Sequence, residues 1–206
     1  LEPDLIITQS QCNVCAVSLD DVQNALKTHL KINPLVISLE PKNLNDVLMD
    51  IKLVGNKLDK DRAANSLINT INDEIDRIKN KHKNKNKINV ACIEWIEPLM
   101  FAGNWVPEIV EIAGANDSFG LKGEHSSWSE YESLFDKNPD KIVFMPCGYD
   151  IKKTKLEIKK LYANKEWRKL KAVKTGNAYI ADGSQFFNRP GPRLLDSIKI
   201  MYDIIN

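Results

Sequence analysis

The sequence has no apolar run that approaches the roughly 20 residues of a membrane-spanning helix. It also lacks an excess of charge of either sign, since 29 Lys and Arg residues stand against 28 Asp and Glu residues and give a formal charge of +1. No overall electrostatic field therefore favours nucleic acid or an anionic membrane surface. We expect no membrane-spanning segment in this chain and no nucleic-acid partner.

The opening LEPDLIITQ lacks the charged region and the apolar region of a signal peptide, and it enters a strand pattern almost at once. We expect that sequence preceding Leu1 belongs to the protein. This terminus therefore does not define the localisation.

Enzymatic motifs are missing as well. The sequence holds neither G-x-S-x-G nor H-E-x-x-H, and its nine glycines form no G-x-G-x-x-G or Walker pattern. The histidines His29, His82 and His125 occupy unrelated contexts, and we expect His29 and His82 to be solvated. The sequence therefore favours a protein that is not an enzyme.

Four cysteines are too few for a disulfide scaffold. Cys92 lies in the apolar run NVACIEW, which is typical of a buried small side chain. Cys12 and Cys15 form a C-x-x-C in the loop after the first predicted strand. This motif leaves three alternatives: a redox dithiol, a soft-metal site completed by Cys147 and assisted by His125, or a disulfide or free thiols that only line the loop.

Short apolar runs rich in Ile and Val alternate with amphipathic helical patterns, which is typical of an α/β protein with a mainly parallel sheet. The predicted strands are Leu5 to Thr8, Leu35 to Ser38, Val90 to Trp95, Ile142 to Met145 and Ala178 to Ala181. The predicted helices are Leu19 to Leu30, Asn43 to Leu58, Val106 to Ala113 and Ser129 to Phe135.

The segment from Asp59 to about Lys83 differs from the rest of the chain. Its apolar positions follow the 3.6-residue period of a helix, and no Gly or Pro interrupts it, so the pattern predicts one long helix. A solvated tract of Lys and Asn follows. We therefore expect a partial first α/β lobe at 1–58, the long helix and its linker at 59–87, and a larger second α/β lobe at 88–206.

Several blocks of the chain resemble the substrate-binding proteins of ABC importers for vitamin B12 and iron-siderophore complexes, particularly the cobalamin-binding group. The resemblance lies in the PDLII strand near the start, in the NVACIEW strand and its following Gly-containing loop and helix, and in the Pro139, Asp140 and Ile142 strand start. It continues in the aromatic loop of Phe186 and Phe187 and in the Pro192 and Arg193 pair that opens the last helix. These blocks occur in the same order as in the family.

The resemblance implies two Rossmann-like α/β lobes bridged by a single long helix, as in class III periplasmic binding proteins, with a first lobe that is incomplete at its N-terminal side. It also implies a monomer that captures cobalamin or a related corrinoid or metal chelate, holds no tightly bound cofactor, and delivers its ligand to an ABC importer permease. An exported protein of this kind is extracytoplasmic. The alternative is a cytoplasmic thiol or metal-handling protein that uses Cys12, Cys15 and Cys147 on the same fold.

Ligands of parallel α/β lobes bind at the carboxyl ends of the strands, where loops and helix N-termini present free backbone N–H groups. This rule selects aromatic and amide side chains, a surface suited to a large and partly apolar ligand such as a corrinoid. The candidates are Trp95, Phe101, Asn104, Trp105, Trp128, Cys147, Gly148, Tyr149, Gln185, Phe186, Phe187 and Arg189.

The Phe186 and Phe187 pair is predicted to lie in an exposed loop, because Gly, Pro and polar residues surround it. Arg189 and Arg193 could bind a ligand phosphate or carboxylate, or Arg193 could only brace the loop. Acidic residues that dock family members on the permease have no clear counterpart, and the loop after Phe187 offers Asn188 where relatives can carry Glu.

Overall fold

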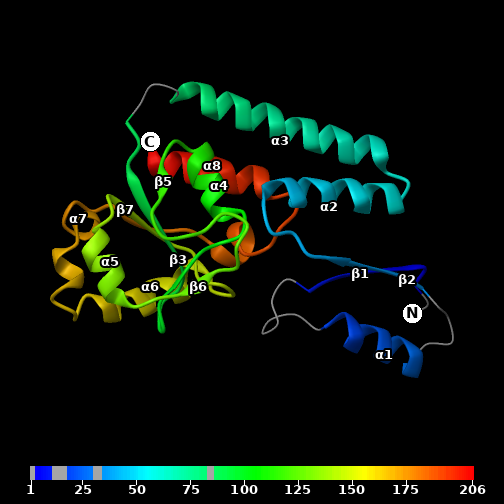
Figure 1. Ribbon diagram of the computed structural model, residues 1–206, viewed down its shortest axis with the longest axis horizontal. Helices are drawn as coiled ribbons and strands as arrows, with labels where there is room; N and C mark the ends of the chain where they lie inside the picture. The colour runs from blue at the N-terminus through cyan, green and yellow to red at the C-terminus, as the bar shows by residue number, and fades with distance from the viewer. Residues whose placement is uncertain (1–2, 11–17, 30–33, 83–85) are drawn as a thin grey trace.

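The structure, a computed structural model, describes residues 3–10, 18–29, 34–82 and 86–206 (Figure 1). Its first part holds the parallel strands β1 (Leu5–Gln9) and β2 (Leu35–Leu39), which pair from Leu5 opposite Leu35 to Gln9 opposite Leu39. Helix α1 (Leu19–His29) lies beside them. Both strands and this helix confirm the elements expected from the sequence. Cys12 and Cys15 lie outside the described residues.

Two helices lead from this first sheet to the rest of the chain. Helix α2 (Leu44–Lys57) and helix α3 (Asp61–Lys81) pack side by side and reverse direction at Asp59. Helix α3 is one uninterrupted element, as its apolar period predicts, and it buries Ile71, Ile75 and Ile78 against the second part of the molecule.

The second sheet has the order β6, β4, β3, β7 and β8, with β5 paired to the first residues of β3. Strands β3 (Asn89–Trp95), β7 (Lys141–Phe144) and β8 (Ala178–Ile180) run parallel and confirm the predicted strands. Sequence patterns missed β4 (Met100–Phe101), β5 (Asn116–Asp117) and β6 (Ser127–Trp128), because two residues are too few to show a period.

Helices cover both faces of this sheet (Figure 1). On one face α4 (Val106–Ile112) and α8 (Leu194–Ile205) join α3 around a core that holds Cys92, which confirms the predicted burial of that thiol. On the other face lie α5 (Tyr131–Lys137), α6 (Ile151–Leu161), the short 3₁₀ turn at Trp167–Lys169 and α7 (Lys171–Lys174).

His82 contradicts the expectation that it is solvated. The side chain is half-buried, and its Nε2 lies 2.7 Å from the carbonyl oxygen of Ile112 at the end of α4. Its ring also packs near Tyr202, with centroids 6.4 Å apart. The surrounding Lys and Asn residues predict a solvated side chain. The contact itself cannot be read from local sequence, because it joins positions 30 residues apart. No described helix combines the length and the apolar character needed to cross a membrane.

Candidate functional site

The loops after β3 and β7 meet at the carboxyl edge of the second sheet. The Cys147 backbone N–H donates to the Glu94 carbonyl at 3.1 Å, which fixes the β7 loop against the end of β3. Tyr149 then packs on Trp95 with ring centroids 5.1 Å apart, and Gly148 makes the turn between them with φ +71. The structure therefore brings together Trp95, Cys147, Gly148 and Tyr149, as the strand-end rule predicts.

A row of apolar side chains extends from this contact across the sheet. Met100 pairs with Trp95 on one side and with Trp128 on the other, so residues of β3, β4 and β6 stand in one cross-strand line. Met100 and Trp128 are directly opposed on antiparallel strands and point to the same face of the sheet, whereas the register between β3 and β4 shifts between Ile93 and Trp95. We call Tyr149, Trp95, Met100 and Trp128 the aromatic row. Trp128 is 63% exposed, whereas the other three are half-buried.

Met100 was absent from the sequence candidates. Nothing in its local context distinguishes it from a core methionine, because its place in the row depends on the register of β4 with both neighbouring strands. The signal that could have found it is the pair of apolar strand-end residues Trp95 and Met100, which are close enough in sequence to form a hairpin.

Three predicted ligand-facing aromatics are core residues instead. Phe101 is 2% exposed and stacks on Phe119 with ring centroids 4.1 Å apart. Trp105 and Phe187 are 3% and 1% exposed, and the Trp105 Nε1–H donates to the Phe187 carbonyl at 3.1 Å. The expectation that these rings face a ligand is corrected, because each fills the apolar interior between the sheet and its helices.

The Phe186 and Phe187 pair does not lie in an exposed loop. Residues Gly183–Phe187 form a single π-helical turn, in which the Asp182 carboxylate accepts from the Gln185 N–H at 2.9 Å. A Cβ at Gly183 would lie 2.2 Å from the Met145 carbonyl oxygen, so glycine is required where the turn packs against the end of β7. Phe186 is half-buried against the core, and Gln185 stays exposed.

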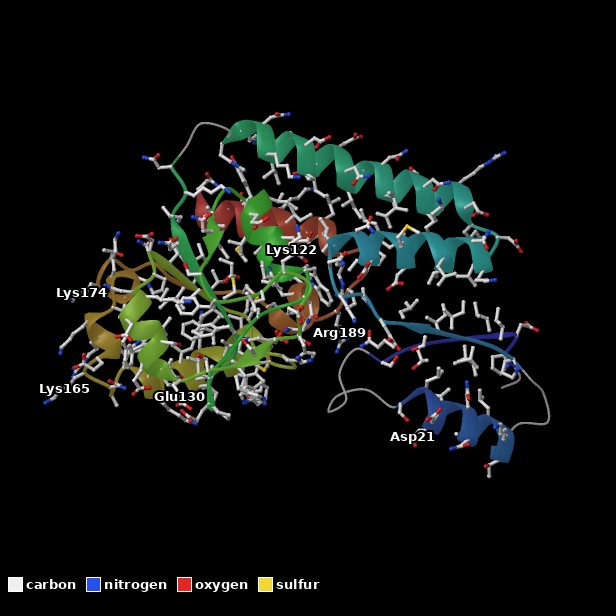
Figure 2. All side chains as sticks on the ribbon, in the orientation of Figure 1. Asp21, Lys122, Glu130, Lys165, Lys174 and Arg189 are labelled. Atoms are coloured by element: carbon white, nitrogen blue, oxygen red, sulfur yellow. The ribbon has the colours of Figure 1, made fainter. Side chains whose placement is uncertain are left out.

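The structure gives Asn104 and Arg189 different roles. The backbone of Asn104, with φ 53, exchanges hydrogen bonds with the loop at Gly123 and Glu124, so this residue positions that loop. Arg189 is exposed, and Figure 2 places it on the side of the second lobe that faces the β1–β2 sheet. Arg189 is therefore the candidate cation for a ligand carboxylate or phosphate. Arg193 is exposed at the N-cap of α8.

A buried carboxyl lies beneath this edge. Glu94 precedes Trp95 in β3 and lies at the register shift between Ile93 and Trp95. Its carboxylate accepts hydrogen bonds from the Ser126 hydroxyl and from the Asn188 amide, and burial nevertheless raises its pKa above the ordinary value of 4.5. Asn188 is thus directed inward, with a buried Oδ1.

A three-thiol metal site receives no support in the described part of the chain. No group of three His, Cys, Asp or Glu residues that could hold a metal ion occurs among the described residues. Cys147 is half-buried at the β7 loop, and its expected partners Cys12 and Cys15 fall outside the described ranges.

One carboxylate of the second part of the chain binds the beginning of α2. Glu108 of α4 accepts from the Leu44 N–H, at the start of α2, at 2.6 Å, and its second oxygen lies 3.1 Å from the Lys122 ammonium. A negative charge at the beginning of a helix stabilises its dipole. Glu108 therefore fixes the direction in which α2 leaves the second lobe.

The curated heme uptake protein IsdE of Staphylococcus aureus (strain MRSA252) is 25% identical over 141 residues, which are 66% of this chain and 48% of IsdE. The chain thus spans about half the length of the curated relatives it matches.

Solved structures agree on the fold. The structure of S. aureus IsdE complexed with heme superimposes with a TM-score of 0.78 at 21% identity, over 98% of this chain and 77% of that one. The periplasmic vitamin B12 binding protein BtuF of Vibrio cholerae gives a TM-score of 0.69 at 15% identity, over 100% of this chain and 74% of that one. The fold is that of class III periplasmic binding proteins, as the sequence predicts.

A family model described as "Periplasmic binding protein" matches residues 1–184. This match covers most of the chain and includes β1, α2, α3 and the strands that form the aromatic row. The chain therefore belongs to the periplasmic binding protein family.

Proposed function

We propose that this chain is part of a substrate-binding protein that captures a metal-centred tetrapyrrole, either a cobalamin-type corrinoid or heme, and delivers it to an ABC importer permease. The names of two similar proteins support this ligand class, since one is a heme uptake protein and the other binds vitamin B12. Both ligands present a broad planar macrocycle. The protein is a monomer on the outer side of the cytoplasmic membrane, binds its ligand reversibly and catalyses no reaction.

The observation that carries this proposal is the aromatic row. Trp95, Met100 and Trp128 pair across β3, β4 and β6 at a strand end, where ligands of this fold class bind, and Tyr149 of the β7 loop packs on Trp95. Aromatic rings and a thioether make a flat and polarisable surface, which complements the face of a macrocycle. The exposed Trp128 has apolar area to bury on such a ligand.

Arg189 supplies the polar part of the site. Heme carries propionates and cobalamin carries amides and a phosphodiester, so a cation at the edge of an apolar surface would orient either one. Its exposure means that Arg189 contributes about 1 kcal/mol or less, whereas burial of a large aromatic side chain contributes roughly 1.5 to 3 kcal/mol. Affinity should therefore depend more on the row than on the arginine.

The experiment is an absorbance titration of the chain with hemin and, separately, with cyanocobalamin. We expect Trp128→Ala to weaken binding by about 10 to 100-fold, because the ring is lost from the ligand contact. Tyr162→Ala is the matched control, since Tyr162 is an exposed aromatic on the α6 side of the molecule. Trp128 is already exposed, so its replacement should leave the fold intact.

The two ligands separate the alternatives within the proposal. Binding of hemin alone assigns heme, and binding of cyanocobalamin alone assigns a corrinoid. Failure of both ligands to bind would refute the tetrapyrrole class. Equal affinity of the wild type and Trp128→Ala would refute the aromatic row as the binding surface.

A further inference from the structure

The near-neutral charge of the whole chain conceals one strongly basic segment. Residues 151–174 contain ten Lys and Arg residues and two Glu residues, a formal charge of +8, while the chain as a whole carries +1. The remainder is therefore acidic. A charge asymmetry of this size between parts of one chain indicates an interaction surface for an anionic partner.

Helix α6 presents much of this charge on one face. Thr154 and Ile158 point into the core with 0% and 7% exposure, so the residues about half a helical turn away face solvent. Leu156 lies on that outer face and is 54% exposed. Its helical neighbours three and four positions away are all lysines, namely Lys152, Lys153, Lys159 and Lys160.

Few of these cations are neutralised within the protein. Lys160 pairs with Glu157, Lys169 with Glu166 and Lys171 with Asp140. In the described ranges no acidic side chain forms a salt bridge with Lys152, Lys155 or Lys159, and all three are exposed. Figure 2 shows Lys165 and Lys174, also of this segment, at the outer edge of the second lobe, away from Asp21 and the first lobe.

We propose that the outer face of α6, with the following turns to Lys174, docks on an anionic lipid bilayer. Lysines attract the bilayer charge, and each one near the surface is worth about a fivefold gain in partition. Leu156, 54% exposed, adds an apolar side chain that can enter the boundary between headgroups and acyl chains. A soluble polyanion would gain nothing from this apolar group, so the combination favours a lipid surface.

The docking surface adjoins the candidate site. Asp150 caps α6 directly after Tyr149, and Lys153 lies over the Tyr149 ring at 3.6 Å from its centroid. Contact of α6 with a bilayer would thus hold the β7 loop and the edge of the aromatic row near the membrane. This inference is independent of which ligand the row binds.

The experiment is co-sedimentation of the chain with vesicles of phosphatidylcholine alone and with vesicles that also contain phosphatidylglycerol. We expect binding only to the anionic vesicles, with a marked loss as ionic strength rises. The triple variant Lys152→Gln, Lys155→Gln, Lys159→Gln should lower the partition coefficient about a hundredfold. The matched control replaces the exposed Lys52, Lys57 and Lys79 of α2 and α3 by Gln and should bind as the wild type does.

The variant Leu156→Gln separates a lipid surface from a soluble polyanion. It should weaken vesicle binding about tenfold and leave binding to long-chain polyphosphate unchanged. An equal loss of binding to anionic vesicles in the triple variant and in its control would show a general charge effect and overturn the proposal. So would binding to polyphosphate without binding to anionic vesicles, or vesicle binding that the triple variant retains.

Discussion

The indole N–H of Trp105 donates to the carbonyl oxygen of Phe187 at 3.1 Å, although the two residues stand 82 positions apart in the sequence. Both side chains are almost completely buried. This contact joins the start of α4 to the π-helical turn before α8. Both aromatic residues therefore belong to the interior, although their sequence positions predict contact with a ligand.

Replacement of Trp105 by Phe tests this structural role. The variant keeps an aromatic ring but leaves the buried Phe187 carbonyl without its donor, so we expect the free energy of unfolding to fall by about 1 to 3 kcal/mol. Urea denaturation measures the loss, and a hemin or cobalamin titration should show unchanged affinity. Reduced affinity with unchanged stability would instead place Trp105 in the binding surface.

The buried Glu94 carboxyl predicts a pH dependence of stability. Burial raises its pKa in the folded state above 4.5, so the folded protein keeps this proton to a higher pH than the unfolded chain does. Stability is therefore lost as the pH rises through the raised pKa. In Glu94→Gln the neutral amide removes this loss.

We expect the melting temperature of Glu94→Gln, relative to the wild type, to increase from pH 4 to pH 8. Differential scanning calorimetry across that range measures it, and Glu132→Gln, an exposed position on α5, is the control. A difference that shrinks as the pH rises would contradict the burial argument.

The contact between His82 and Gly114 predicts a non-additive pair of substitutions. Gly114 has φ +98, and a Cβ there would lie 2.7 Å from the His82 ring. Gly114→Ala should therefore lower the free energy of unfolding by about 1 to 3 kcal/mol. In the double variant with His82→Ala the steric part of this cost disappears, so the combined loss should be smaller than the sum of the single losses. Chemical denaturation of the three variants measures this, and strict additivity would disprove the contact.

Helix α3 predicts limited motion between the two parts of the molecule. It holds neither Gly nor Pro over Asp61–Lys81 and buries one apolar face, so it has no residue at which to hinge. Small-angle scattering profiles with and without ligand should nearly superimpose. The exposed substitutions Asn72→Gly and Asp73→Gly should broaden the apo profile, whereas strong compaction of the wild type on binding would contradict this prediction.

Much of the fold follows from local sequence pattern. The predicted strands and most helices are confirmed, and α3 is predicted from its apolar period alone, because periodicity reports which face of an element is buried. The burial of Cys92 inside an apolar run follows from the same signal. The order of several blocks, from the PDLII strand to the Pro192 and Arg193 pair, indicates the family without a structure, and the family match over residues 1–184 confirms that indication.

Tertiary structure alone decides which side chains face a ligand. Phe187 has the sequence context of an exposed loop, yet Gly183 lets the turn pack so tightly on β7 that the ring enters the core. Met100 joins Trp95 and Trp128 only through strand register, and Glu94 meets Ser126 and Asn188 from distant loops. Sequence periodicity determines which face of one element is buried, whereas a binding surface is built from several elements whose relative placement depends on long-range packing.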